Sequence, residues 1–144
     1  MNKQYAVLAT FGRLLIAAIF LVSGLGKIAN PQMTQGYIAS AGLPFPLLAY
    51  VTAVAIELAG GALLIVGFQT RIVGIVMAIF TVAAALSFHH NLADQNQMAH
   101  FLKNIAITGG LLQVVALGAG SFSIDGRRAR SRSDFPVNRI PTAA

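Results

Sequence analysis

Residues 47–67 read LLAYVTAVAIELAGGALLIVG, a run of 21 residues whose only charged side chain is Glu57. A helix of about 20 apolar residues crosses the roughly 30 Å hydrocarbon core of a bilayer, so the run predicts a membrane span. A carboxylate in mid-bilayer is costly, and it must face the bundle interior, find a partner or stay protonated. The stretch therefore predicts a helical membrane bundle with a polar group inside it.

Three further apolar runs, at about 8–26, 72–88 and 101–120, repeat this pattern along the 144 residues. Charged residues make up only 10% of the sequence, against about 25% in soluble domains, and the mean hydropathy is +0.73. We therefore predict an all-α integral membrane four-helix bundle, formed as one domain by residues 1–125. Small residues within the spans predict close helix packing: they are Gly24, Gly26, Gly60, Gly61, Gly109 and Gly110.

The distribution of Lys and Arg predicts how the bundle lies in the membrane, because these residues concentrate in cytoplasmic segments. With both termini inside, seven basic residues are cytoplasmic and two are external. The seven are Lys3, Arg71, Arg127, Arg128, Arg130, Arg132 and Arg139, and the two are Lys27 and Lys103. We predict an N-in/C-in topology in a bacterial inner membrane, with residues 126–144 as a basic, disordered cytoplasmic tail. Arg13 interrupts the first run, which we interpret as a retained span rather than a cleaved signal peptide.

The first outer loop contains its own helix signals. Asn30 stands at a favoured N-cap position, Pro31 follows at the first helical position, and Gly42 marks the end. The loop therefore predicts a short helix that lies in the membrane interface.

Polar side chains near the predicted outer ends of the spans indicate a pocket that opens outward, with Glu57 at its floor. These side chains are Ser23, Lys27, His89, His90, Lys103 and Asn104. At 1.5 Å of rise per residue, Arg13 lies about 6 Å to the cytoplasmic side of the bilayer centre and Lys103 about 10 Å to the outer side. Either cation is a candidate partner for Glu57. The structural alternatives are an ion pair that fixes helix packing and lysines that reach to the headgroups.

The histidines raise the question of a metal site. His89 and His90 project about 100° apart on a helix, so they do not favour one ion between them. One of them with Asp94 and His100 would supply three ligands, yet no pair of histidines on facing helices suits a haem. We predict no metal site and no resident cofactor, with a quinone as a candidate ligand.

Four stretches of the sequence form a recognisable set: GRLLIAAIFLVSGLGKI, AIELAGGALLIVGFQTR, FHHNLADQNQMAHFLKNIAITGGLL and the closing GSFSID. They resemble the DoxX family of small bacterial inner-membrane proteins, and the match runs from about residue 11 to residue 125. The resemblance implies a four-helix membrane protein, and it places the family's polar pattern on Arg13, Lys27, Glu57, Arg71, His89 or His90, Lys103 and Asn104. The family takes its name from a membrane component associated with thiosulfate:quinone oxidoreductase, which implies a redox association.

The chain contains no cysteine, so disulfide frameworks, thiolate metal sites, iron–sulfur clusters and thiol relays within this chain are excluded. We expect a redox-associated subunit, without independent catalytic activity, whose pocket holds a quinone or other lipophilic molecule. The expected partners are the lipid bilayer and a membrane or periplasmic redox enzyme, and no nucleic acid. Two alternatives stay open: a non-enzymatic docking or assembly factor, and a small proton-coupled transporter.

Overall fold

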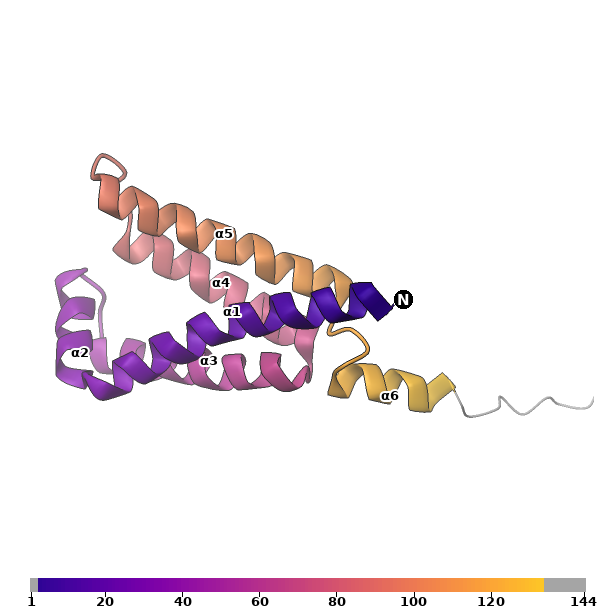
Figure 1. The fold of residues 1–144 in the computed structure, drawn as a ribbon. Helices are drawn as coiled ribbons and strands as arrows, with labels where there is room; N and C mark the ends of the chain where they lie inside the picture. The colour runs from indigo at the N-terminus through magenta and orange to yellow at the C-terminus, as the bar shows by residue number, and fades with distance from the viewer. Residues whose placement is uncertain (1–2, 134–144) are drawn as a thin grey trace, which may run out of the picture.

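The computed structural model describes residues 3–133, and this part of the chain folds into six helices and no strand (Figure 1). They are α1 (Lys3–Ala29), α2 (Pro31–Ser40), α3 (Pro46–Val66), α4 (Thr70–Phe88), α5 (Gln95–Leu117) and α6 (Ile124–Ser133). Four of them, α1, α3, α4 and α5, are long and apolar enough to cross a membrane. The prediction of an all-α bundle with four spans is confirmed.

The last span differs most from its predicted bounds. Helix α5 begins at Gln95, within a polar stretch, because the Asp94 carboxylate caps it by accepting a hydrogen bond from the Gln97 amide at 2.8 Å. The same helix ends at Leu117, since Gly118 follows with a φ of 76°, in the left-handed region that favours glycine. Local capping therefore sets both ends, and the hydropathy pattern does not record it.

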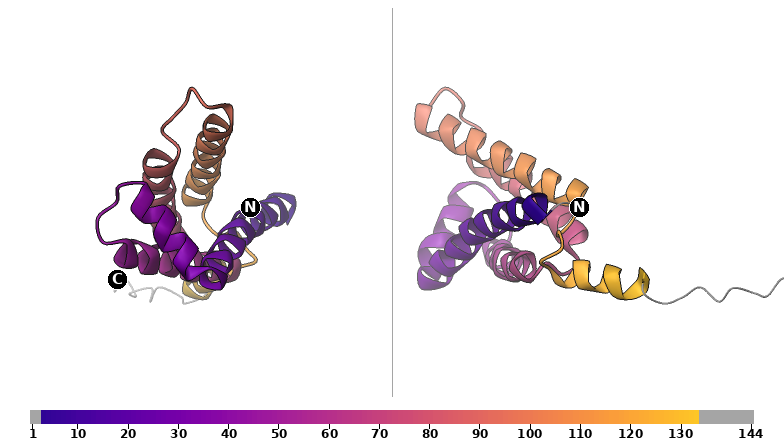
Figure 2. Two further views of the ribbon diagram at one scale, coloured as in Figure 1. Left: turned by 90° about the vertical axis from the view of Figure 1, so that its left-hand side faces the viewer. Right: turned by 45° about the vertical axis from the view of Figure 1, so that its right-hand side comes forward.

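The spans form two pairs that meet at one end. Helix α1 packs along α3, and α4 packs along α5. The pairs lie close together near α6 and the start of α1, and they diverge toward α2, as Figure 1 and the right-hand view of Figure 2 show. Buried Phe20, Leu64, Met77 and Leu111 fill the space between the pairs.

Glycines let α3 approach both of its neighbours. A Cβ added at Gly60 would come within 2.7 Å of Met77, and one at Gly61 within 2.8 Å of Leu21. Gly24 and Gly110 are also close to side chains of neighbouring helices, so close packing at these four glycines is confirmed. It was wrongly predicted at two others, Gly26 and Gly109, where a Cβ would meet nothing within 4 Å.

Helix α2 runs across the ends of α1 and α3 (Figure 1). The predicted helix is confirmed, but the Asn30 side chain does not cap it: its amide donates backward to the Gly26 carbonyl at 3.3 Å. Tyr37 stacks on Phe88 at 5.2 Å between ring centroids, and Ile38 is buried. These contacts connect α2 to the end of α4.

Arg13 and Asp125 hold the opposite end of the bundle. Arg13 is 1% exposed and donates to the Ala119 carbonyl at 2.9 Å and to the Phe122 carbonyl at 3.1 Å. The Asp125 carboxylate accepts from the Gln69 amide at 3.0 Å and the Thr70 amide at 2.9 Å, and so caps α4. Together they fix the chain after α5 against α1 and α4.

The predicted tail begins as a helix. Helix α6 covers residues 124–133, where the sequence led us to expect an irregular chain from residue 126 onward. The acidic Asp125 in its first turn and the basic Arg130 and Arg132 in its last turn both suit the helix dipole. Arg139 lies outside the described residues.

Candidate functional site

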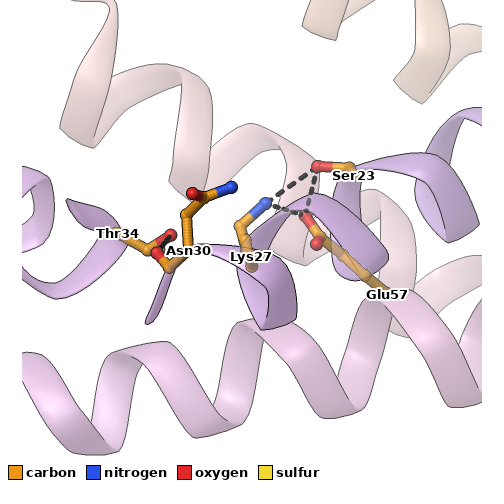
Figure 3. Close-up of polar contacts among 5 residues, drawn as sticks. All are labelled: Ser23, Lys27, Asn30, Thr34 and Glu57. Atoms are coloured by element: carbon orange, nitrogen blue, oxygen red, sulfur yellow. Dashed lines mark hydrogen bonds and ion pairs between the residues drawn. The ribbon is translucent and has the colours of Figure 1, made fainter. Parts of the chain in front are cut away.

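A charged pair lies between the first two spans. Lys27 Nζ is 2.8 Å from Glu57 Oε1 and also donates to Ser23 Oγ at 2.8 Å, while Ser23 Oγ donates to the same Glu57 oxygen at 3.1 Å (Figure 3). Ser23 and Lys27 are one turn apart on α1 and therefore share a face. Glu57 is 5% exposed, whereas the Lys27 side chain is 25% exposed. The pair is thus a buried carboxylate held by a cation that extends toward the end of its helix.

The two carboxylate oxygens of Glu57 differ in their hydrogen bonding. Glu57 Oε2 is buried and has no hydrogen-bond partner among the described residues. A buried polar atom without a partner is uncommon, and it often marks a functional position. In the same region, Thr34 donates to the Asn30 carbonyl at 2.9 Å, which continues the polar face past the end of α1 (Figure 3).

A cavity of about 120 Å³ lies between all four spans beside this carboxylate. Its apolar lining is Ile19, Phe20, Phe80, Ala84 and Ile107. Its polar lining is Ser23, Glu57, Thr81, Lys103 and Asn104. Small-molecule sites likewise combine apolar side chains with polar groups that orient the ligand.

Lys103 connects the cavity to the loop after α4. Its Nζ is 3.0 Å from His100 Nδ1, and the His100 ring stacks on His89 at 5.0 Å between centroids. His89 Nδ1 is 2.8 Å from Gln97 Oε1. His89 at the end of α4 and the first turns of α5 thus contribute a row of polar side chains that ends at the cavity.

The structure brings most of the predicted site residues together. Ser23, Glu57, Lys103 and Asn104 line the cavity, Lys27 pairs with Glu57, and His89 joins through His100. His90 is exposed and lies outside this group. Among the described residues no three His, Asp or Glu side chains are placed to hold a metal ion.

The partner of Glu57 is Lys27, and the two partners suggested by depth, Arg13 and Lys103, were wrong. Arg13 lies at the other end of the bundle, where it binds backbone carbonyls. Lys103 faces the cavity from α5 and makes its hydrogen bond with His100. The depth of a residue in the bilayer could not identify the partner of Glu57, because depth does not show which helices pack together.

Sequence reasoning missed Phe20, Phe80 and Thr81, which line the cavity. Thr81 had a recognisable signal, since it is a polar residue in the middle of the third apolar run. Its hydroxyl donates to the Met77 carbonyl at 2.7 Å, as buried threonines in membrane helices often do. The two phenylalanines had none, because aromatic residues are common in any span.

The fold and the buried pair define a small helical membrane protein with a polar site between its spans. Family comparison is consistent with this class: the DoxX family model matches residues 8–90, and the chain belongs to the DoxX family. Inner membrane protein YqjF of Escherichia coli K12 is 35% identical over 125 residues, which are 87% of this chain and 95% of that protein. Inner membrane protein YphA of the same organism is 32% identical over 126 residues, covering 84% and 90%.

A third relative is the "Putative oxidoreductase CatD" of Bacillus subtilis strain 168. It is 39% identical over 87 residues, which are 60% of this chain and 63% of that protein. No solved structure matches the chain.

Proposed function

We propose that this protein binds a small lipophilic ring compound of the quinone type in the cavity beside Glu57, as a membrane subunit associated with redox enzymes. The observation that carries the proposal is a buried charged pair next to a cavity lined by all four spans. A charged group inside a membrane is costly, and in transporters and pumps such groups mark functional sites. An apolar cavity of about 150 Å³ is known to hold benzene, so about 120 Å³ suits a single ring.

The relatives support the redox part of this proposal. One of the similar proteins is described as a putative oxidoreductase, and its match covers 87 residues of this chain. The chain has no cysteine, so electrons would pass to or from a partner enzyme or a bound ring rather than a dithiol of this chain. We expect that partner to be a membrane or periplasmic redox enzyme.

The cavity can be tested with two neighbouring alanines of α4. Ala84 lines the cavity, whereas Ala83 is exposed on the outside of the bundle. Mass spectrometry of small molecules that copurify from native membranes should find one defined ring compound in the wild type and in Ala83→Leu. The compound should be lost in Ala84→Leu, which fills the cavity, and reduced in Glu57→Gln. If all four preparations carry only bulk phospholipid, the proposal is wrong.

The proposed topology has both termini in the cytoplasm, and the seven-to-two distribution of basic residues supports it. Because the chain has no cysteine, a single introduced cysteine reports one position without background. In intact cells, an impermeant maleimide should label Asn91→Cys, in the loop after α4, and not Ser131→Cys, in α6. The opposite labelling pattern would reverse the topology.

A second candidate function is the docking of a partner protein, and α6 is the observation that favours it. The helix exposes Arg127, Arg128, Arg130 and Arg132 beside the bundle end. Deletion of residues 127–144 should then abolish partner recovery by crosslinking in native membranes, while Glu57→Gln should not. Crosslinks that join only copies of this chain would rule this candidate out.

A further inference from the structure

The α1, α3 and α4 side of the cavity offers only hydrogen-bond acceptors. Ser23 uses its hydroxyl hydrogen on Glu57 Oε1, and Thr81 uses its own on the Met77 carbonyl. Glu57 Oε2 has no partner among the described residues, and a carboxylate oxygen accepts. Glu57 is one of the residues that line the cavity, so this unpartnered oxygen belongs to the cavity wall. A ligand on this side is therefore required to donate.

The α5 side of the cavity offers donors. An ammonium group has three hydrogens, and Lys103 gives one of them to His100. Asn104 adds an amide whose NH₂ makes no hydrogen bond with the described residues. Helix α5 lies across the bundle from α3, with α1 and α4 between them (Figure 1). The cavity thus has acceptors at one wall and donors at the facing wall.

We infer that the ligand is a neutral ring that carries a hydroxyl toward Glu57 and a second oxygen toward Lys103 and Asn104. This inference rests on the proposed function and specifies the ligand class of the same cavity. A hydroquinone satisfies both walls, since each hydroxyl can donate or accept. A quinone carbonyl only accepts, so it satisfies α5 but places its oxygen against the Glu57 carboxylate. The site accordingly favours the reduced ring over the oxidised ring.

The charges around the cavity make a cationic ligand a poorer fit than a neutral one. Lys27 already neutralises Glu57 at 2.8 Å, and Lys103 adds a second positive charge at the cavity. A protonated amine would donate to Glu57 but would also be repelled by the two lysines. A neutral hydroxyl avoids this repulsion while making the same hydrogen bond.

Substitution of Glu57 by glutamine should replace the hydrogen-bond acceptor at this wall with a donor. Lys27 and Ser23 both donate to Oε1, so the amide oxygen takes that position and the NH₂ takes the position of Oε2. The wall then donates, and a carbonyl compound becomes the better ligand. A hydrogen bond to a charged group accounts for about ten-fold to about 100-fold in affinity, which is the preference expected in the wild type.

The test compares two para-oxygenated six-membered rings of similar size, hydroquinone and 1,4-cyclohexanedione, the second of which only accepts. Equilibrium dialysis of full-length protein in lipid nanodiscs, under anaerobic conditions and against empty nanodiscs, measures both affinities. We expect hydroquinone to bind at least about ten-fold more tightly to the wild type, and the preference to be lost or reversed in Glu57→Gln.

Two results would count against these proposals. Equal binding of both rings by the wild type, lost in Ala84→Leu, would overturn the donor inference while the cavity proposal stands. No binding of either ring above empty nanodiscs would overturn the proposed function itself. Should Glu57→Gln not fold, the wild-type ratio still decides, and Thr81→Val, which removes a different acceptor of the same wall, should lower hydroquinone affinity alone.

Discussion

Replacing Lys27 by methionine removes the cation that lies 2.8 Å from Glu57 while keeping an unbranched side chain. The carboxylate, 5% exposed, then keeps only the Ser23 hydroxyl at 3.1 Å. Loss of one partner from a buried ion pair costs about 3 to 5 kcal/mol. Lys27 is itself 25% exposed, which reduces this cost, so we expect a loss of about 2 to 3 kcal/mol.

Equilibrium unfolding in mixed micelles with increasing SDS, followed by circular dichroism, measures this loss. Lys103→Met is the matched control: it removes a lysine at the same cavity whose hydrogen bond is with an imidazole, and its effect should stay within about 0.5 kcal/mol. The double variant Lys27→Met with Glu57→Gln should recover most of the loss, since no charge is then left unpaired. Equal stability of the two single lysine variants would refute the reasoning.

Two further predictions concern the packing of α1 and the cap of α4. A Cβ at Gly24 would lie 2.7 Å from Leu58. Gly24→Ala should therefore lower the free energy of unfolding by about 1 to 2 kcal/mol in the same assay. Gly26→Ala is the control and should not lower it, because a Cβ there would meet nothing within 4 Å. For Asp125, burial alone would raise the pKa, but hydrogen bonds from the backbone amides of Thr70 and Gln69 and the charge of Arg128 outweigh it and hold the pKa below its ordinary value. The stability from this carboxylate is therefore present above about pH 4 and is lost as the pH falls through the lowered pKa. Asp125→Asn should remove that acid-dependent loss in thermal unfolding scans; an unchanged pH profile would show that the cap contributes nothing.

The sequence was sufficient for the fold because lipid imposes strong conditions on composition. Four long apolar runs with few charges have few folded alternatives to four spanning helices, and the structure agrees. The bounds were less accurate where a single side chain decides them. Asp94 extends α5 into a polar stretch, and Gly118 ends it inside an apolar one.

The sequence indicated which polar residues lie near Glu57 better than it indicated which cation pairs with it. Glu57 had to meet a partner, and Ser23 with Lys27 formed a visible i, i+4 pair on one helix face. Arg13 looked equally suitable by depth, yet it binds the Ala119 and Phe122 carbonyls. Those carbonyls lie in the non-helical turn after α5, and tertiary packing brings them to Arg13, which no periodicity in the sequence shows.

The two ends of the bundle are held by interactions of different strength, and this difference positions the site. At the α6 end, Arg13 on α1 makes two hydrogen bonds with the carbonyls of Ala119 and Phe122 after α5, and both bonds involve a charged side chain. Bonds of this kind contribute about 1.5 to 3 kcal/mol each. At the α2 end, where the pairs diverge, the described contact across them is the stack of Tyr37 on Phe88, and such a stack contributes about 0.5 to 1.5 kcal/mol.

Motion between the pairs should therefore occur mainly at the α2 end, with the α6 end as the fixed point. The cavity lies between the pairs, so separation of the pairs widens it without breaking the α1–α3 contact that carries the Lys27–Glu57 bond. On the proposed function, this separation would let a ring compound enter and leave while the charged pair stays intact and buried. The two helices that hold the pair would then not have to move apart for a ligand to reach the cavity.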